Sequence, residues 1–554
     1  MSYAFPVDTI RAAEEPLMNA QQETDELMRS AAYVVAVAAQ TMLRAQPAQP
    51  GAESVLLLVG GGGNGGDALY AGASLAEYGY PVDAVLLDPR GRVHARAREA
   101  FLAAGGRVLA TFPARNLAAY RLIIDGLLGI GGQGGLNEEL ARTLFPLRRA
   151  AAPVLAVDVP SGVEADSGRV PEPFTTELHQ HVPAHLDADV TVTFGGLRYA
   201  HCLTTACGEV ILGDIEVRGR TLSGELTQLQ SQGEIPQVFA VRAIPYRRDY
   251  DWPALFISPQ PEEIVAVEPA PTDDKYSGGV VGICAGSAAY PGAAILSTHA
   301  AVRATSSMVR YVGSQAGEVV RAYPEVVVSA TLAETDRVQA WVFGPGRGVD
   351  DAAAAELAEL LRREREALLI DADGITLLAE HPELREALRA RSGSTVLTPH
   401  VGEFRRLAEA VGETVPDPAA GPVAAVAALA RELDCAVLLK GRFTLIAHPN
   451  REFVAVSAID AGTSWAATAG SGDVLSGLLG ARMAHSTVVA GNAMAQYAGE
   501  EAFHPGLYSL VDGVQIHAVA TWLSAQTPDG AAPTSASRIA KYIPRATARL
   551  SARG

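Results

Sequence analysis

A glycine-rich loop in the first half of the chain carries an amide and a carboxylate side chain that could bind a ligand. The loop runs from Gly60 to Asp67, follows the continuous apolar run 55–59 and includes Asn64. Such a loop lets the backbone approach a phosphate group, and the N-terminus of a following helix adds partial positive charge. The oxygens of Asn64 and Asp67 also suit a hard cation or a ribose. Tight-turn geometry alone would explain several of the glycines.

Two further acidic residues end apolar runs in the same half. Asp125 closes the run 122–125 before a glycine-rich stretch, and Asp158 closes the run 154–158 shortly before Ser161. Ligands of open parallel sheets bind outside the carboxyl ends of the strands, where these side chains are expected to lie. Helix capping would explain either aspartate alone. Together with the first loop, however, they predict a shared pocket.

The segment 468–477 carries the strongest chemical signal of the second half. Its small residues would leave the N–H groups at a helix start open, which forms an anion hole for a transferring phosphoryl group. Asp473 stands where a carboxylate could take a proton from an attacking hydroxyl group. A helix cap would also explain Asp473 when it is taken alone.

Further polar motifs follow predicted strands of the second half, at 344–348, 371–374, 398–403 and 440–441. Lys440 could line a nucleotide phosphate. His400 suits a structural role when it is considered by itself. Beside the other motifs, we expect it to contact the substrate.

The order of apolar runs and helical stretches predicts an α/β fold. Strands and helices alternate along both halves, which is typical of parallel sheets with right-handed crossovers. Between residues 218 and 274 the chain is rich in Gln and Pro, and the alternation stops. We therefore predict two different domains, 1–224 and 225–554. Strands are expected at 55–59, 82–87, 122–125, 154–158, 190–194, 209–212, 280–284, 340–343, 368–370, 395–397 and 436–439, and helices of the first half at 8–20, 23–44, 67–78 and 137–150.

The composition excludes several classes of protein. The 554 residues are 48% hydrophobic, which excludes wholesale disorder. The formal net charge of −18 argues against non-specific nucleic-acid binding and against binding to an anionic membrane surface. The four cysteines include no CxxC pair, and we expect them to be reduced and mostly buried. No signal peptide and no membrane-spanning apolar run is visible, so we expect a cytoplasmic protein.

The motifs of the first half resemble the NAD(P)H-hydrate epimerase domain over about residues 1–220. The match rests on the loops around Asn64, Asp125 and Asp158 and on the segments 188–195 and 213–215. The resemblance implies a K⁺ ion bound by Asn64, Asp125 and Ser161, with Asp158 as the acid/base. Arg198 departs from the lysine that many relatives carry. The residues implied to contact the hydrated dinucleotide are Asn64, Gly65, Gly66, Asp67, Ala68, Gly129, Ile130, Gly131, Gly132, Gln133, Gly134, Gly135 and Asp158.

The second half resembles the ribokinase-like superfamily and, within it, the ADP-dependent NAD(P)H-hydrate dehydratases, over about residues 225–554. Segments 274–279, 286–294, 323–325 and 468–477 carry the match. The departures are Ala469, where a glycine is common, and Tyr497-Ala498-Gly499, near the place of a usual His-Gly pair. The residues implied to contact the hydrate are Ala293, Gly346, His400 and Asp473. Those implied to contact the nucleotide are Lys440, Gly441, Arg442, Phe443, Thr444 and Gly472.

The two halves in this order resemble the bifunctional NAD(P)H-hydrate repair enzymes. That family implies two three-layer α/β/α domains, Rossmann-like and then ribokinase-like. The first would interconvert the R and S epimers of NADH or NADPH hydrate (NADHX and NADPHX). The second would dehydrate the S epimer with ADP and Mg²⁺, giving NAD(P)H, AMP and phosphate. The expected partners are these small molecules and, in a homo-oligomer, other copies of the chain.

Three other functions are compatible with parts of the sequence. A small-molecule kinase with a regulatory first half would form a stable phosphorylated product and prefer ATP. A non-catalytic dinucleotide sensor would bind without turnover. An NAD-dependent oxidoreductase is disfavoured, because the first glycine loop lacks the G-x-G-x-x-G spacing of that class, although Asp88 stands near the usual distance for its acidic residue.

Overall fold

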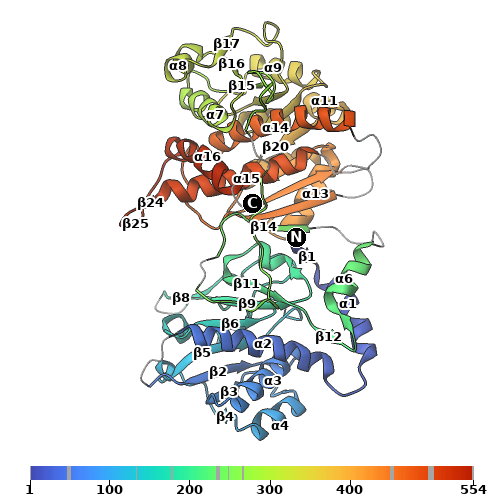
Figure 1. Cartoon of the computed structure of the whole chain (residues 1–554), viewed down its shortest axis with the longest axis vertical. Coiled ribbons are helices and arrows are strands. Elements are labelled where there is room, and N and C mark those ends of the chain that lie inside the picture. The colour runs from blue at the N-terminus through green and yellow to red at the C-terminus, as the bar shows by residue number, and fades with distance from the viewer. Residues whose placement is uncertain are drawn as a thin grey trace. The chain divides into compact units, whose positions relative to one another are not determined.

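The computed structural model describes residues 2–46, 51–132, 134–175, 179–231, 238–246, 249–264, 268–449, 454–496 and 505–551. The chain forms two compact units. One comprises Met1–Phe239 and Tyr246–Pro259, and the other comprises Ala240–Pro245 and Gln260–Gly554. Each unit is built around a sheet with helices packed on it (Figure 1). The boundary between residues 224 and 225 stays a prediction.

The first unit contains a seven-stranded parallel sheet in the order β11-β9-β6-β5-β2-β3-β4. Counted along the chain, this is the Rossmann order 3-2-1-4-5-6 with one more strand at the edge. The predicted α/β fold is confirmed. The strands are β2 (Ser54–Val59), β3 (Val82–Leu86), β4 (Arg107–Leu109), β5 (Tyr120–Gly126), β6 (Val154–Val157), β9 (Val190–Phe194) and β11 (Glu209–Gly213).

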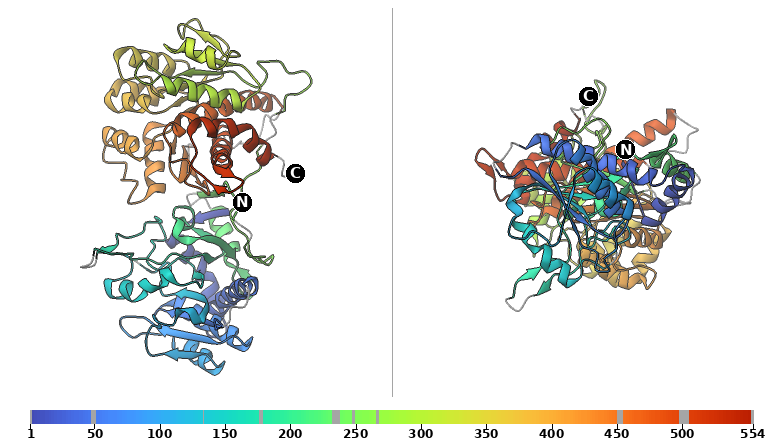
Figure 2. Two further views of the ribbon diagram at one scale, coloured as in Figure 1. Left: turned by 90° about the vertical axis from the view of Figure 1, so that its left-hand side faces the viewer. Right: turned by 90° about the horizontal axis from the view of Figure 1, so that it is seen from below.

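Helices cover both faces of this sheet (Figure 2). Successive residues of β2 point to opposite faces of the sheet. Leu57 packs into a core with α1 to α4, whereas Leu56 and Leu58 pack on the other face with α5. A continuous apolar run is therefore needed, because side chains of a strand alternate between faces. The helices are α1 (Val7–Ala20), α2 (Glu26–Ala45), α3 (Gly63–Glu77), α4 (Ala95–Ala103), α5 (Glu138–Leu144) and α6 (Leu222–Ser231).

The start of α3 corrects the prediction for the first glycine loop. The helix begins at Gly63, four residues earlier than expected, so Asn64 lies in its first turn. Gly65 makes this possible, since a Cβ there would come within 2.0 Å of the Gly60 carbonyl oxygen. Short strand pairs complete the unit: β1 (Ser2–Phe5) with β10 (Leu197–Arg198), β7 (Phe174–Thr175) with β8 (His181–Val182), and β12 (Glu216–Val217) with β13 (Arg220–Thr221).

In the second unit, the sheet runs in the order β23-β22-β21-β20-β19-β18-β15-β16-β17. Strand β22 is antiparallel to both neighbours, which departs from the purely parallel sheet that the alternation predicts. The strands are β15 (Val281–Cys284), β16 (Val309–Val312), β17 (Val327–Ser329), β18 (Ala340–Phe343), β19 (Ala367–Ile370), β20 (Thr395–Leu397), β21 (Ala436–Leu439), β22 (Phe443–Pro449) and β23 (Val454–Asp460). Strand β14 (Val238–Arg242) lies where the chain passes between the units, and β24 (Gln526–Thr527) pairs with β25 (Gly530–Ala531).

Helix α14 is the central helix of the second unit. It contacts β15, β18 and β19 and shares a buried core with α7, α15 and α16. The helices are α7 (Pro291–Ala304), α8 (Ala316–Ala322), α9 (Asp351–Leu361), α10 (Asp373–Glu380), α11 (Pro382–Ala390), α12 (Val401–Val411), α13 (Pro422–Leu433), α14 (Ser471–Gln496), α15 (Pro505–Ala525) and α16 (Ala536–Ser551). The predicted Tyr497-Ala498-Gly499 departure lies outside the described residues.

Two expectations about the whole chain can be compared with the fold. All four cysteines are buried, as predicted, and no two of them form a disulfide bond. Within the described part of the chain, no helix combines the length and apolar character that crossing a membrane requires.

Candidate functional site

The first unit holds a cavity of about 480 Å³ at the carboxyl ends of β2, β5 and β6. Its walls include the predicted residues Asn64, Asp67, Gly129, Ile130, Gly131, Gly132 and Asp158, together with Arg198. Gly65, Gly66, Ala68, Gly134 and Gly135 do not line it, and Gln133 lies outside the described residues. The parallel sheet thus brings three separate loops to one pocket, as expected from the strand ends. Asp125 and Ser161, however, do not line it.

Asp125 and Ser161 form a buried polar corner of this unit. The Ser161 hydroxyl donates to one Asp125 carboxylate oxygen at 2.6 Å, and the Ser161 N–H donates to the other at 2.8 Å. Burial raises the pKa of Asp125 to about 6, against the lowering effect of these hydrogen bonds. No cationic side chain of the described residues pairs with Asp125. The carboxylate is therefore a buried charge without a counter-charge.

Asn64 reaches the loop that covers this corner. Its Nδ2 donates to the Val157 carbonyl oxygen at 2.7 Å. A Cβ on Gly129 would lie 2.2 Å from Asn64 Oδ1, so only glycine lets the loop close over the amide. The Leu128 N–H donates to Ser161 Oγ at 2.9 Å, which ties the same loop to the corner. Oxygen-bearing groups of three chain segments thus gather in one region.

Asp158 is held rigidly at the cavity wall. Its backbone has a positive φ of 67°, and its side chain is buried. Arg198, 1% exposed, places NH2 3.0 Å from Asp158 Oδ1, and the Ile130 N–H donates to Oδ2 at 3.2 Å. The departure from lysine at position 198 therefore places a buried guanidinium directly on the proposed acid/base.

His201 fixes the backbone of this ion pair. Nδ1 accepts the Arg198 N–H at 2.9 Å, so the proton belongs on Nε2, which donates to the Asp158 carbonyl oxygen at 2.7 Å. Burial, followed by the charge of Arg198, lowers the pKa of His201 to about 4. The ring is thus neutral at physiological pH and acts here as a connector between two backbone segments.

Two more carboxyl groups share the cavity with Asp158. Burial raises the pKa of Asp67 well above its usual value, and the charges of Asp158 and Glu14 add to the increase. Burial also raises the pKa of Glu14, although Arg198 opposes the increase. Sequence reasoning missed Glu14, because it stands in an ordinary amphipathic helix with no motif around it. These two carboxyl groups of the cavity therefore keep their protons to higher pH than an exposed carboxyl group would.

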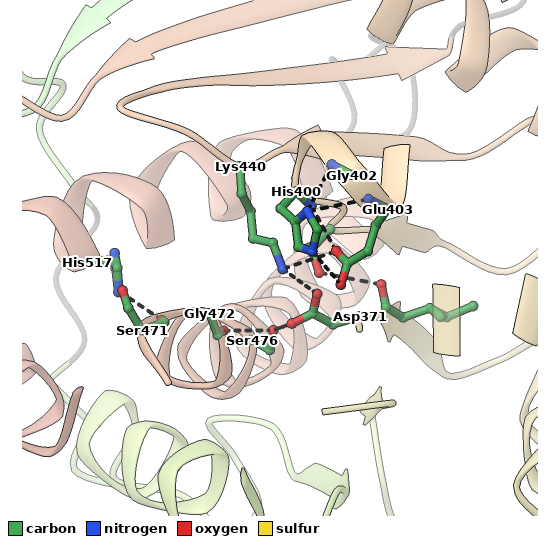
Figure 3. A network of polar contacts seen from close by, with 11 residues as sticks. Asp371, His400, Gly402, Glu403, Lys440, Ser471, Gly472, Ser476 and His517 are labelled. Atoms are coloured by element: carbon green, nitrogen blue, oxygen red, sulfur yellow. Dashed lines mark hydrogen bonds and ion pairs between the residues drawn. The ribbon is translucent and has the colours of Figure 1, made fainter. Parts of the chain in front are cut away.

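In the second unit, the start of α14 faces charged groups from two strand ends (Figure 3). Lys440 follows β21 and places Nζ 2.6 Å from Asp371 Oδ1, at the end of β19. The Ser476 hydroxyl, on α14, donates to Asp371 Oδ2 at 2.6 Å. Nζ lies only 3.6 Å from the point where Gly472 would carry a Cβ. The lysine ammonium therefore stands over the first turn of this helix.

Asp473 lies in the same first turn of α14 and is largely buried. Burial raises its pKa to about 6, the nearby Asp371 charge adds to the increase, and Lys440 opposes it. Burial by itself lowers the pKa of Lys440, but Asp371 and Glu403 outweigh that effect and raise it. A carboxylate with such a pKa can accept a proton near neutral pH, beside an ammonium that stays charged.

The other residues that the sequence predicts for this site lie in loops and at the starts of helices and strands of the second unit. Gly346 has a φ of 58°, and a Cβ there would come within 2.9 Å of the Ala293 methyl, so these two predicted hydrate contacts adjoin. His400 caps α12: Nδ1 accepts the Gly402 N–H at 3.0 Å, while the side chain stays 60% exposed. Arg442 bonds to Asp460 at 2.7 Å. Of the remaining residues implied to contact the nucleotide, Phe443 and Thr444 begin β22, and Gly441 lies two residues before it.

Comparison with known proteins assigns the chain to a family. Residues 281–516 match the family model described as "NAD(P)H-hydrate dehydratase". Residues 24–200 match the family model described as "YjeF-related protein N-terminus". The bifunctional NAD(P)H-hydrate repair enzyme of Corynebacterium glutamicum is 49% identical over 577 residues, covering 99% of each chain. The chain belongs to the bifunctional NAD(P)H-hydrate repair enzymes. The Mycobacterium tuberculosis member is 43% identical over 484 residues, 87% of this chain and 89% of its own.

Family membership confirms the main functional prediction over the kinase alternative. The chain is a bifunctional NAD(P)H-hydrate epimerase and dehydratase, and the two family matches fall one in each unit. Among solved structures, the ADP/ATP-dependent NAD(P)H-hydrate dehydratase from Bacillus subtilis, co-crystallised with ATP and Mg²⁺, aligns with a TM-score of 0.41 and 22% identity. That alignment covers 51% of this chain and 94% of that one.

Proposed function

We propose that the first unit epimerises NADHX and NADPHX in its cavity, with Asp158 as the acid/base. The second unit dehydrates the S epimer with ADP, with Asp473 as the base. The observation that carries the second assignment is the placement of Asp473 in the first turn of α14, beside the Lys440 ammonium. The residue roles and the use of ADP rest on the sequence resemblance. The homo-oligomer and the cytoplasmic location are further parts of the proposal.

Asn64, Asp125 and Ser161 fit a bound K⁺ ion. Asp125 is fully buried with a raised pKa and has no cationic partner among the described residues, so a cation would balance its charge. Amide, carboxylate and hydroxyl oxygens are ligands suited to hard cations. When bound, K⁺ supplies a fixed positive charge at this corner. The chain's own contribution is to hold Asp158 against Arg198 at the cavity wall.

Side chains of the second unit are not expected to be the main ligands of Mg²⁺. The described residues contain no cluster of three or more His, Cys, Asp or Glu side chains able to hold a metal ion. We therefore propose that Mg²⁺ is held mainly by the nucleotide phosphates, where it supplies charge neutralisation. Lys440 and the open N–H groups of α14 bind and orient the phosphates from the protein side.

The dehydration proceeds in two steps, phosphoryl transfer and then elimination. Asp473 takes the proton of the C6 hydroxyl as its oxygen attacks the β-phosphorus of ADP, and the bond to AMP breaks. The lone pair of the ring nitrogen then expels phosphate from C6, and loss of a proton from C5 restores the C5–C6 double bond. The products are NAD(P)H, AMP and phosphate. The unstable phosphate ester explains why a kinase-like site would give a dehydration.

A spectrophotometric assay tests these assignments. The full chain, mixed with R and S hydrate and ADP, is expected to restore the absorbance of reduced nicotinamide. Asp473→Asn should abolish this recovery while ADP still binds, and wild-type turnover by that variant would refute the base assignment. Asp158→Ala should keep dehydration of S and slow clearance of R to the spontaneous rate. Unchanged R clearance would refute the role of Asp158.

A further inference from the structure

Asp371 joins the lysine and the helix of the dehydratase site. Its side chain is 1% exposed, and each carboxylate oxygen has one short contact: Oδ1 with the Lys440 ammonium and Oδ2 with the Ser476 hydroxyl, both at 2.6 Å. The Ser476 hydroxyl also lies 3.1 Å from the Gly472 carbonyl oxygen, within the first turns of α14. One carboxylate therefore connects the ends of two strands to the start of the helix (Figure 3).

The backbone at Asp371 is held by a tight turn and by the loop that packs on it. The Gly374 N–H donates to the Asp371 carbonyl oxygen at 2.9 Å, which closes a four-residue turn. Ala372, in its centre, has φ 49° and ψ −114°, close to a type II′ position that favours glycine. A Cβ on Gly344 would lie 1.9 Å from the same carbonyl oxygen, so the loop after β18 packs directly on the turn. Such strain persists where the surroundings over-determine the conformation.

We propose that Asp371 is a positioning residue of the dehydratase: it holds the Lys440 ammonium at a fixed place over the first turn of α14, where the transferring phosphoryl group is bound. This inference rests on the proposed function of the second unit. Lysine carries its charge on a flexible four-carbon stem, so a fixed ammonium needs an anchor. A preorganised cation stabilises the charge that develops during transfer without reorganising at the moment of reaction.

Stability alone does not account for this arrangement. A buried ion pair contributes little net stability compared with apolar residues of similar volume. Here, moreover, a second carboxylate, that of Glu403 on α12, lies 3.8 Å from Lys440 Nζ. Two carboxylates thus restrict the ammonium, which lies 3.6 Å from the point where Gly472 would carry a Cβ.

Asp371→Asn separates positioning from packing. The amide keeps the shape but loses the negative charge, and an NH2 group replaces one of the two oxygens that face Lys440 and Ser476. We expect kcat for dehydration of the S hydrate to fall about 100-fold, since small displacements of a catalytic group have effects of this size. ADP affinity, measured by calorimetry on the full chain, should weaken by no more than about tenfold. Ser476→Ala removes only the link to α14 and should give a smaller loss of kcat.

Asp434→Asn is the matched control. Asp434 is an exposed residue just before β21, at the opposite end of that strand from Lys440, and its left-handed conformation is one that asparagine tolerates. Its substitution removes one carboxylate charge, as Asp371→Asn does. Its kcat should equal that of the wild type. The inference is overturned if Asp371→Asn and Ser476→Ala keep wild-type kcat, or if kcat falls only as the folded fraction falls in urea titrations. A wild type that binds ADP but does not dehydrate the S hydrate would instead refute the proposed function, and the ADP affinities would still test Asp371.

Discussion

At the scale of single residues, both units keep carboxyl groups in places where ionisation is unfavourable. Burial raises the pKa of Asp125 and of Asp473 to about 6, and that of Asp67 well above its usual value. A carboxyl group with a pKa near the working pH can both take and return a proton. The same burial lowers the stability of the folded state, because the charged form would be better solvated in the unfolded chain.

Asp473→Asn should therefore stabilise the second unit while removing its activity. The pKa of Asp473 is raised in the folded state, so its favourable contribution is complete at pH values below the unfolded pKa and is lost as the pH rises through about 6. At pH 7.5 the neutral amide should gain about 1–3 kcal/mol in the free energy of unfolding. Near pH 4 the difference should vanish.

Urea unfolding of the wild type and of Asp473→Asn at the two pH values measures this difference. The acid limb of the wild-type rate, with an apparent pKa near 6, gives an independent reading of the same group. A variant that is less stable than the wild type at pH 7.5 would contradict the burial argument. Ser476→Ala offers a control on the same helix that removes a hydroxyl group but no charge.

At the scale of elements, the sequence predicted the strand ends better than the contacts between them. Continuous apolar runs are typical of strands buried on both faces, and the parallel arrangement brings their carboxyl ends together. This reasoning found Asn64, Asp125 and Asp158. It did not find the pairing of Lys440 with Asp371, which lie 69 residues apart, nor Glu14 on α1. Those contacts depend on side-chain packing between elements, which no local pattern encodes. The antiparallel β22 was missed for the same reason.

The loop that follows β5 provides a test at this scale. Gly129→Ala would place a methyl 2.2 Å from Asn64 Oδ1, so the loop and the amide must separate. We expect clearance of the R hydrate to slow at least about tenfold, with dehydration of S unchanged. Gly224→Ala, on α6 and outside the cavity wall, is the control, because the residue is exposed, has no positive φ, and a Cβ there meets only the Thr221 hydroxyl, at 3.0 Å. Equal rates for the two variants would show that closure of the loop over Asn64 is not needed.

At the scale of the whole molecule, the two activities occupy separate compact units, each with its own core and its own site. Asp158 and Asp473 lie in different units, and we expect the effects of their substitution on rate to be independent. An R/S mixture should therefore return to NADH in one phase with the wild type. With Asp158→Ala it should return in two phases: a fast one from the S epimer and a slow one at the spontaneous rate of R.

Mixing two inactive sites tests whether the hydrate moves freely between them. Asp158→Ala keeps the dehydratase, and Asp473→Asn keeps the epimerase, so equal amounts of both should restore single-phase recovery if the S epimer diffuses through solution. The amplitude should match the wild type, and the rate should rise with the concentration of Asp473→Asn. The control is Asp158→Ala mixed with an Asp158→Ala/Asp473→Asn double variant, which should stay biphasic. A biphasic trace from the complementary pair would contradict free exchange, and would mean that R is converted efficiently only when both sites belong to the same chain.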